Sequence, residues 1–153
     1  QFCYSLIDTV QKLHEQAKLL HCDLKPDNIR WRDGVVHLID FEHAQPISKA
    51  KSLRSTKGFE APEIIKTMPC STLTDAYSVG KTILHTLETL VDMTSEQQSL
   101  SYRMLCDVAR NLAKPDSKSR WTLTQALGKI QECITLQDNH LFSSIKGGKK
   151  GAN

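Results

Sequence analysis

The sequence predicts a mainly α-helical domain that carries one short β-hairpin. Two observations support this fold class. Apolar residues recur at helical spacing in several separate stretches, and the dipeptide Asp33-Gly34, a strong turn signal, lies between two short apolar runs. A chain of 153 residues has the usual length of one domain and is long enough to bury a sizeable core.

The first 20 residues are predicted to form one helix, because their apolar side chains recur every three or four positions and share one face. These side chains are Phe2, Leu6, Val10, Leu13 and Ala17. Residues 29–31 and 35–39 are the predicted strands of the hairpin. Residues 40–63 show no helical period and are predicted to form a loop.

Three further helices are predicted in the second half. The first runs from Thr74, a plausible N-cap, to about Val91, and its apolar stripe consists of Val79, Ile83, Leu87 and Leu90. The second lies near 97–113, ahead of Pro115, and the last runs from about 122 to 134. The C-terminus is rich in Lys and Gly, so we assign 1–136 to the domain and 137–153 to a flexible basic tail.

Residues 21–28 and 40–42 hold the most informative pattern of the chain. The first segment reads His-Cys-Asp-Leu-Lys-Pro-Asp-Asn and the second reads Asp-Phe-Glu. Two Asp and one Asn at this spacing suit phosphoryl transfer from a nucleotide. One carboxylate orients the attacking hydroxyl, and the other carboxylate and the amide oxygen hold magnesium against the phosphates. Further motifs follow in order: Ala61-Pro62-Glu63, then Asp-Ala-Tyr-Ser-Val-Gly at 75–80, then Arg120.

Together these motifs resemble the C-terminal lobe of a eukaryotic protein kinase of the Ser/Thr type, over roughly residues 1–136. The resemblance implies one lobe of an α+β two-lobed fold, with ATP and Mg²⁺ as cofactors. It also implies a protein substrate that offers a Ser or Thr hydroxyl, to which the γ-phosphate of ATP is transferred.

The resemblance carries over to individual site residues. Asp23 matches the catalytic aspartate, and Lys25 matches the lysine that neutralises the transferring phosphate. Asn28 and Asp40 match the magnesium ligands, and Arg30 occupies the position that forms the floor beneath adenine. The structural alternative for both aspartates is a loop or cap carboxylate.

Six more residues match positions of the activation segment or of the supporting structure: His21, Phe41, Thr56, Glu63, Asp75 and Arg120. The resemblance implies that Thr56 bonds the catalytic Asp and Lys, and that Asp75 holds the backbone of the catalytic loop. Glu63 and Arg120 would form a bidentate pair that ties the activation segment to the late helices. His21 is expected to pack beneath Phe41 and not to act as an acid or base.

Three residues depart from the family pattern and bear on activity. Cys22 replaces the arginine that normally pairs with a phosphate on the activation loop. Glu42 replaces a glycine, so the metal loop loses backbone freedom and gains a carboxylate. Arg30 stands where the family has an apolar residue, and its guanidinium could stack on the base or fill the pocket.

The nucleotide clamp of the family lies upstream of the catalytic loop, and the chain contains no G-x-G-x-x-G. We therefore expect the small N-terminal lobe to lie upstream of Gln1, and the fragment alone to be inactive. A complete protein with half a kinase is the alternative. For function, the alternatives are a pseudokinase that acts as a binding or scaffold module, and a small-molecule kinase of the aminoglycoside or choline type.

Composition bounds the partners and the compartment. A net charge of +3 is too small to indicate nucleic acid, and no stretch indicates a membrane span or a signal peptide. None of the five cysteines forms C-x-x-C, which favours reduced thiols in an intracellular, cytoplasmic setting. The expected activation segment is basic, through Lys49, Lys51, Arg54 and Lys57. Such runs are mostly solvated loop faces, and the functional alternative is a preference for acidic substrates or partners.

Overall fold

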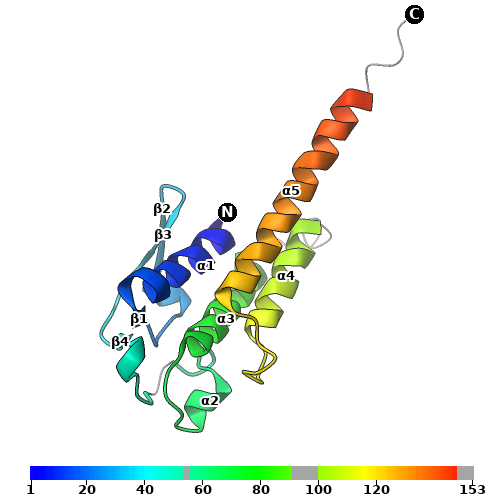
Figure 1. Cartoon of the computed structure of the whole chain (residues 1–153). Coiled ribbons are helices and arrows are strands. Elements are labelled where there is room, and N and C mark those ends of the chain that lie inside the picture. The colour runs from blue at the N-terminus through cyan, green and yellow to red at the C-terminus, as the bar shows by residue number, and fades with distance from the viewer. Residues whose placement is uncertain (54–55, 91–99, 148–153) are drawn as a thin grey trace, which may run out of the picture.

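The computed structural model describes residues 1–53, 56–90 and 100–147, with side chains for residues 1–53, 56–89 and 100–135 (Figure 1). Its helices and strands are, in order, α1 (Phe2–Lys12), β1 (Leu19–Leu20), β2 (Ile29–Arg32), β3 (Val35–Leu38), β4 (Gln45–Pro46), α2 (Pro62–Ile65), α3 (Thr72–Leu90), α4 (Leu100–Leu112) and α5 (Leu123–Gly147). A π-helical turn covers Leu13–Ala17, and short 3-10 turns cover Pro26–Asn28 and Ile47–Lys49. The mainly α fold with a small antiparallel sheet is confirmed.

The main core lies between the helices and the hairpin. Helix α1 contacts α3, α5 and strand β3, and α4 packs against both α3 and α5. The apolar side chains of α1 that the sequence places on one face are largely buried, with Leu6 and Val10 at 0% exposure. Ala17 is exposed, because the helix widens into a π-helical turn after Lys12, which shifts the helical period, and the turn ends at Lys18 with a φ of 55°.

The predicted hairpin is present as β2 and β3. Ile29 pairs with Leu38 and Arg32 pairs with Val35 in an antiparallel register. Asp33 and Gly34 both have positive φ, at 52° and 77°, as the tight two-residue turn of a hairpin requires. A backbone hydrogen bond from Ile39 N–H to Asn28 O, at 3.0 Å, continues this pairing at the open end of the hairpin. It holds the residue before β2 next to the residue after β3.

The segment 40–63 is less irregular than the sequence predicts. Strand β4 pairs antiparallel with β1, and the short helix α2 begins at Pro62. These elements are only two and four residues long, so they leave no periodic signal in the sequence. A second core cluster lies beneath this segment and contains Leu20, Cys22, Ala61, Ile64 and Cys70.

Helix α3 begins at Thr72, two residues before the predicted start. Ser71 is the residue that caps it. The Thr74 backbone N–H donates to Ser71 Oγ at 3.3 Å, and the Ser71 backbone N–H donates to Thr74 Oγ1 at 2.9 Å. This reciprocal arrangement is a capping box, in which the expected cap, Thr74, is the third helical residue. The predicted end near Val91 lies outside the described residues.

Helices α3 and α4 approach closely at Gly80. A Cβ atom built on Gly80 would lie 2.6 Å from the Ala109 carbonyl oxygen and 2.8 Å from the Ala113 amide nitrogen. Both neighbours are backbone atoms, which cannot turn away as a side chain can. The absence of a side chain at Gly80 therefore sets the distance between these two helices.

Helix α5 is longer than the 122–134 that the pattern predicts. It extends to Gly147, so residues 137–147, which we expect to belong to a flexible tail, have a helical backbone. The C-terminal part of α5 projects away from the rest of the molecule (Figure 1). Within the described residues, no helix is both long and apolar enough to cross a bilayer.

Candidate active site

The carboxylate of Asp23 is the centre of a polar network in the catalytic loop. Its Oδ1 accepts hydrogen bonds from the backbone N–H of Thr56 at 3.1 Å and from the Thr56 hydroxyl at 2.8 Å. Its Oδ2 lies 3.1 Å from Lys25 Nζ. Lys25 Nζ also donates to Thr56 Oγ1 at 2.7 Å, so the three side chains form a closed triangle.

The network keeps Asp23 ionised. Burial by itself would raise the pKa of this carboxyl group, but hydrogen bonds from the Thr56 hydroxyl, Lys25 and the Thr56 backbone outweigh it and lower the pKa below its ordinary value. Asp23 is 6% exposed. The site thus holds a charged acceptor that lies mostly below the molecular surface.

Asn28 is held with its carbonyl oxygen turned away from Asp23. Its amide nitrogen donates to the Asp23 backbone carbonyl at 2.8 Å and to Asp23 Oδ2 at 3.2 Å. Both partners can only accept, so the amide must present its NH₂ to them and its oxygen elsewhere. Carboxylate and amide oxygens are the donors that Mg²⁺ prefers.

Asp40 lies near Asn28 because the hairpin joins them, through the bond between Asn28 O and Ile39 N–H. It is exposed, and its only hydrogen bond in the described part of the chain is a weak one from the Glu42 N–H at 3.4 Å. The carboxylate is therefore available to a cation. Among described residues, no group of three or more His, Cys, Asp or Glu side chains could hold a metal ion. Mg²⁺ commonly uses one or two carboxylates plus substrate phosphates, which fits this donor set.

The left-handed backbone of this segment lies at Asp40 and not at Glu42, the residue that replaces glycine. Asp40 has a φ of 61°, in the left-handed region, whereas the φ of Glu42 is not positive. Asp tolerates this region better than most residues because its short polar side chain can bond locally. Replacement of glycine by Glu42 therefore imposes no left-handed backbone on a bulky residue.

Both ring nitrogens of His21 form hydrogen bonds with backbone atoms. Nδ1 is 3.4 Å from the Asp23 N–H and Nε2 is 3.1 Å from the Ile39 carbonyl oxygen. A neutral ring with its proton on Nε2 satisfies both contacts. The ring also lies 4.9 Å, between centroids, from Phe41. These contacts link the catalytic loop to the segment around Asp40 and leave no nitrogen for acid–base work.

Asp75 holds the backbone of the catalytic loop from helix α3. Its Oδ2 accepts from the His21 N–H at 2.8 Å, and its Oδ1 accepts from the Cys22 N–H at 3.0 Å. His14 Nε2 lies 2.8 Å from Oδ2. All of these groups are buried, and Cys22 has a φ of 64°. The carboxylate thus fixes a left-handed turn immediately before Asp23.

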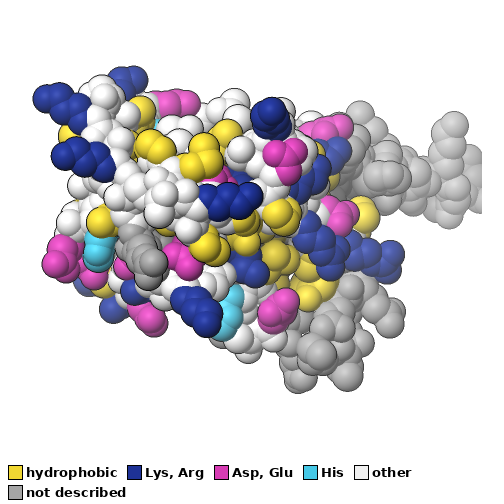
Figure 2. All heavy atoms as spheres, turned by 90° about the horizontal axis from the view of Figure 1, so that it is seen from below, with side chains coloured by type: hydrophobic (Ala, Val, Ile, Leu, Met, Phe, Trp, Pro, Cys, Tyr) yellow, Lys and Arg dark blue, Asp and Glu magenta, His cyan; other side chains and the backbone are white. Residues whose placement is uncertain are grey.

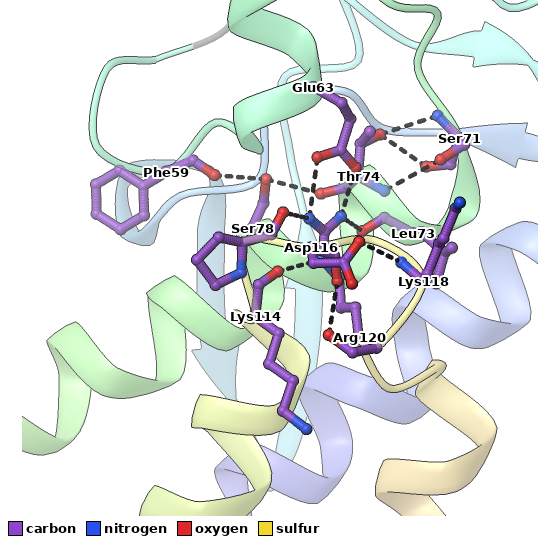
Figure 3. A network of polar contacts seen from close by, with 12 residues as sticks. Phe59, Glu63, Ser71, Leu73, Thr74, Ser78, Lys114, Asp116, Lys118 and Arg120 are labelled. Atoms are coloured by element: carbon purple, nitrogen blue, oxygen red, sulfur yellow. Dashed lines mark hydrogen bonds and ion pairs between the residues drawn. The ribbon is translucent and has the colours of Figure 1, made fainter.

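Glu63 and Arg120 form a buried bidentate pair (Figure 3). Arg120 uses all five of its N–H donors: two on the Glu63 carboxylate and one each on the carbonyls of Leu73, Lys114 and Pro115. Its guanidinium also lies 4.9 Å from the centre of the Tyr77 ring. The pair therefore ties α2 to α3 and to the loop before α5.

Arg30 and the lysines of the expected activation segment lie at the surface, unlike the buried residues around Asp23. The Arg30 guanidinium folds back onto its own loop and donates to the carbonyls of Asp27 at 2.9 Å and Ile29 at 3.1 Å. Lys49, Lys51 and Lys57 are exposed, and Arg54 lies outside the described residues. Seen from below, the molecule shows Lys and Arg side chains interspersed with acidic and hydrophobic ones (Figure 2). These features favour a solvated face over a single basic patch.

Sequence reasoning missed His14, Gln45 and Cys70. His14 contacts Asp75, and the Gln45 amide nitrogen lies near the sulfurs of both Cys22 and Cys70. None of these residues belongs to a recognisable motif, and their partners are distant in the sequence. Only the tertiary fold brings them to the catalytic loop.

Comparison with known proteins gives two findings. The family model of the protein kinase domain matches residues 1–136. The smooth muscle myosin light chain kinase of Gallus gallus is 32% identical over an alignment of 153 residues, which covers 83% of this chain. The chain spans 8% of the length of that relative.

Proposed function

Because the chain belongs to the protein kinase domain family, we propose that its whole protein transfers the γ-phosphate of ATP to a Ser or Thr hydroxyl of a protein substrate, with Mg²⁺. Residues 1–136 would provide the C-terminal lobe of this enzyme. The observation that carries the proposal is the closed contact of Asp23, Lys25 and Thr56, with the Asn28 amide bonded to Asp23.

Each residue has a role that follows from its contacts. Asp23 is buried and has a lowered pKa, so it is ionised at neutral pH and orients the substrate hydroxyl as an acceptor. Lys25, held 2.7 Å from the Thr56 hydroxyl and 3.1 Å from Asp23 Oδ2, supplies positive charge beside Asp23. A lysine at this position is the feature that favours Ser/Thr over Tyr substrates.

Asn28 and Asp40 would hold the cation through the amide oxygen of one and the carboxylate of the other. When bound, Mg²⁺ supplies charge neutralisation at the phosphates. The contribution of the protein is positioning: Asp23 fixes the Asn28 amide, and the hairpin brings Asp40 alongside. No Gly-rich loop occurs in residues 1–153, so we expect this chain alone to show no measurable phosphate transfer.

A pseudokinase that acts as a binding or scaffold module is the second candidate. Two departures from the family pattern favour it. Glu42 adds a carboxylate two residues after Asp40, which could repel the phosphates or add a metal ligand, and Arg30 introduces a guanidinium at the position predicted to form the floor of the adenine site. In that case the network of Asp23 would serve only to hold the catalytic loop.

Asp40→Asn in the whole protein separates the two functions. Asn keeps the size of the side chain and removes the charge, so turnover should fall at least about a hundredfold, or about 2.7 kcal/mol in the barrier. Its melting temperature should stay close to that of the unmodified protein, because Asp40 is exposed and weakly bonded.

Asp33→Asn is the matched control, since Asp33 is also exposed and also has a positive φ, in the hairpin turn. It should keep full activity. Absence of γ-phosphate transfer by the unmodified protein, with intact nucleotide binding, would establish the pseudokinase instead. Equal turnover of the Asp40→Asn and Asp33→Asn proteins would show that Asp40 holds no catalytic metal.

A further inference from the structure

Two cysteines meet at the base of the catalytic loop. Cys22 lies in that loop between His21 and Asp23, and Cys70 lies immediately before Ser71, the cap of α3. Both are buried, at 7% and 5% exposure, and both belong to the small core cluster beneath residues 45–70. The fold therefore brings together two thiols from the two ends of the segment that contains the candidate site.

One amide is shared by the two sulfurs. Gln45 Nε2 lies 3.8 Å from Cys22 Sγ and 3.9 Å from Cys70 Sγ. The amide is fixed from its other side, because Gln45 Oε1 accepts the Lys51 N–H at 2.7 Å. The Cys70 N–H in turn donates to the Lys51 carbonyl at 3.2 Å. Gln45 is half-buried, so one of the side chains in contact with the two thiols reaches the molecular surface.

The two thiols differ in acidity because of each other. The hydrogen bond with Cys70 and then burial raise the pKa of the Cys22 thiol, and the nearby Asp75 carboxylate adds to this effect. The hydrogen bond from Cys22 lowers the pKa of the Cys70 thiol, against the opposing effect of burial and of Asp75. Cys22 is thus the proton donor of the pair and Cys70 the more nucleophilic sulfur.

We propose that Cys22 and Cys70 are a redox-active dithiol that a peroxide converts to an intramolecular disulfide. The Cys70 thiolate attacks one oxygen of hydrogen peroxide, the O–O bond breaks, and hydroxide leaves with a proton as water. Cys70 is then a sulfenic acid. The Cys22 sulfur attacks the Cys70 sulfur, the S–O bond breaks, and the departing hydroxide takes the Cys22 proton as a second water. The two thiols lose two electrons, and the peroxide gains them.

The disulfide would close a ring that contains the whole candidate site. Residues 22–70 include Asp23, Asn28, Asp40 and Thr56, and the backbone N–H groups of both cysteines are already anchored, on Asp75 and on Lys51. The bond would therefore lock the catalytic loop to the start of α3. This property is separate from the proposed phosphate transfer and does not depend on it.

Tryptic peptides test the proposal directly on the 153-residue chain. Each of the five cysteines falls in a different peptide: residues 1–12, 19–30, 67–81, 104–110 and 130–146. After treatment with near-stoichiometric hydrogen peroxide, alkylation and non-reducing digestion, mass spectrometry should find peptide 19–30 joined to peptide 67–81 as the main crosslink. The joined mass should be lower by two hydrogen atoms, and dithiothreitol should restore both peptides.

Cys3 and Cys106 provide an internal control, because they are also buried and close enough to interact electrostatically. Burial raises the pKa of Cys3 to about 11, so peptides 1–12 and 104–110 should stay reduced. Cys70→Ser should abolish the crosslink, Cys22→Ser should leave a sulfenic acid on Cys70 that dimedone traps, and Cys106→Ser should change nothing. Absence of the 19–30/67–81 crosslink in the unmodified chain, or an equal yield for all cysteine pairs, would overturn the proposal.

Discussion

Glu63→Gln tests the buried pair that ties the activation segment to the late helices. The substitution keeps the size of the side chain but removes its charge. The Arg120 side chain is fully buried, and two of its five N–H donors point at the Glu63 carboxylate. In the variant, the guanidinium keeps its charge with no counter-ion, and the NH₂ of the new amide faces one of these donors. One hydrogen bond is lost and a buried charge is left uncompensated.

The magnitude follows from this geometry. Removing one partner of a buried ion pair costs about 3–5 kcal/mol of unfolding free energy. We expect about 3 kcal/mol, the lower end, because three backbone carbonyls still accept from Arg120 and Gln can still accept one bond. Glu132→Gln is the matched control. Its pair with Lys129, at 2.9 Å, is half-exposed, so water screens it and its loss should cost far less than the loss of the Glu63 carboxylate.

The pH dependence sharpens the test. Burial would raise the pKa of Glu63, but the hydrogen bonds from Arg120 outweigh it and hold the pKa below the ordinary value of 4.5. The stability that the ionised carboxylate contributes is therefore complete above pH 4.5 and is lost as the pH falls through the lower folded-state pKa. The free-energy difference between the unmodified chain and the Glu63→Gln variant should be constant near neutral pH and should shrink in acid.

Urea unfolding followed by tryptophan fluorescence and circular dichroism measures both effects. A free-energy cost of Glu63→Gln at pH 7 no larger than that of Glu132→Gln would show that the pair contributes no more than a surface ion pair. A difference between the unmodified chain and the Glu63→Gln variant that did not fall in acid would show that the ionised carboxylate is not its source.

Three further variants test other parts of the structure. Asp23→Asn in the whole protein should abolish phosphate transfer and, unlike Asp40→Asn, should also lower the free energy of unfolding by about 1–3 kcal/mol, because Asp23 is buried and bonded to Thr56, Lys25 and Asn28. Activity and urea unfolding measure this, and the stability cost should fade below about pH 4, since the pKa of Asp23 is lowered in the fold. Gly80→Ala should destabilise the chain by about 1–2 kcal/mol net, because contacts of 2.6 and 2.8 Å with backbone atoms of Ala109 and Ala113 outweigh the gain in helix propensity. Gly128→Ala, where a Cβ meets nothing within 4 Å, should instead stabilise it by about 0.5–1 kcal/mol, and equal shifts of the two variants would contradict the close approach of α3 and α4.

The fold class, the positions of most helices, the hairpin and the family could all be predicted from the amino-acid sequence. These features depend on local chemistry. A few neighbouring residues are enough to predict them. Examples are the apolar spacing in α1 and α3, the Asp33-Gly34 turn with its positive φ values, and the linear motifs around Asp23 and Asp40. The ends of the helices were harder to predict. The side chain that caps α3 belongs to Ser71, which precedes the apolar stripe, and α5 continues past its last clear apolar turn.

Contacts between residues that are distant in the sequence could not be predicted and emerge from the packing of the folded chain. Nothing near Cys22 in the sequence indicates Cys70 or Gln45, and nothing near Asp75 indicates His14. The close approach of α3 and α4 at Gly80, and the placing of the left-handed backbone at Asp40 and not at Glu42, also come from packing. Contacts of this kind depend on how whole elements pack against one another, and a local pattern reports the period and the caps of one element only.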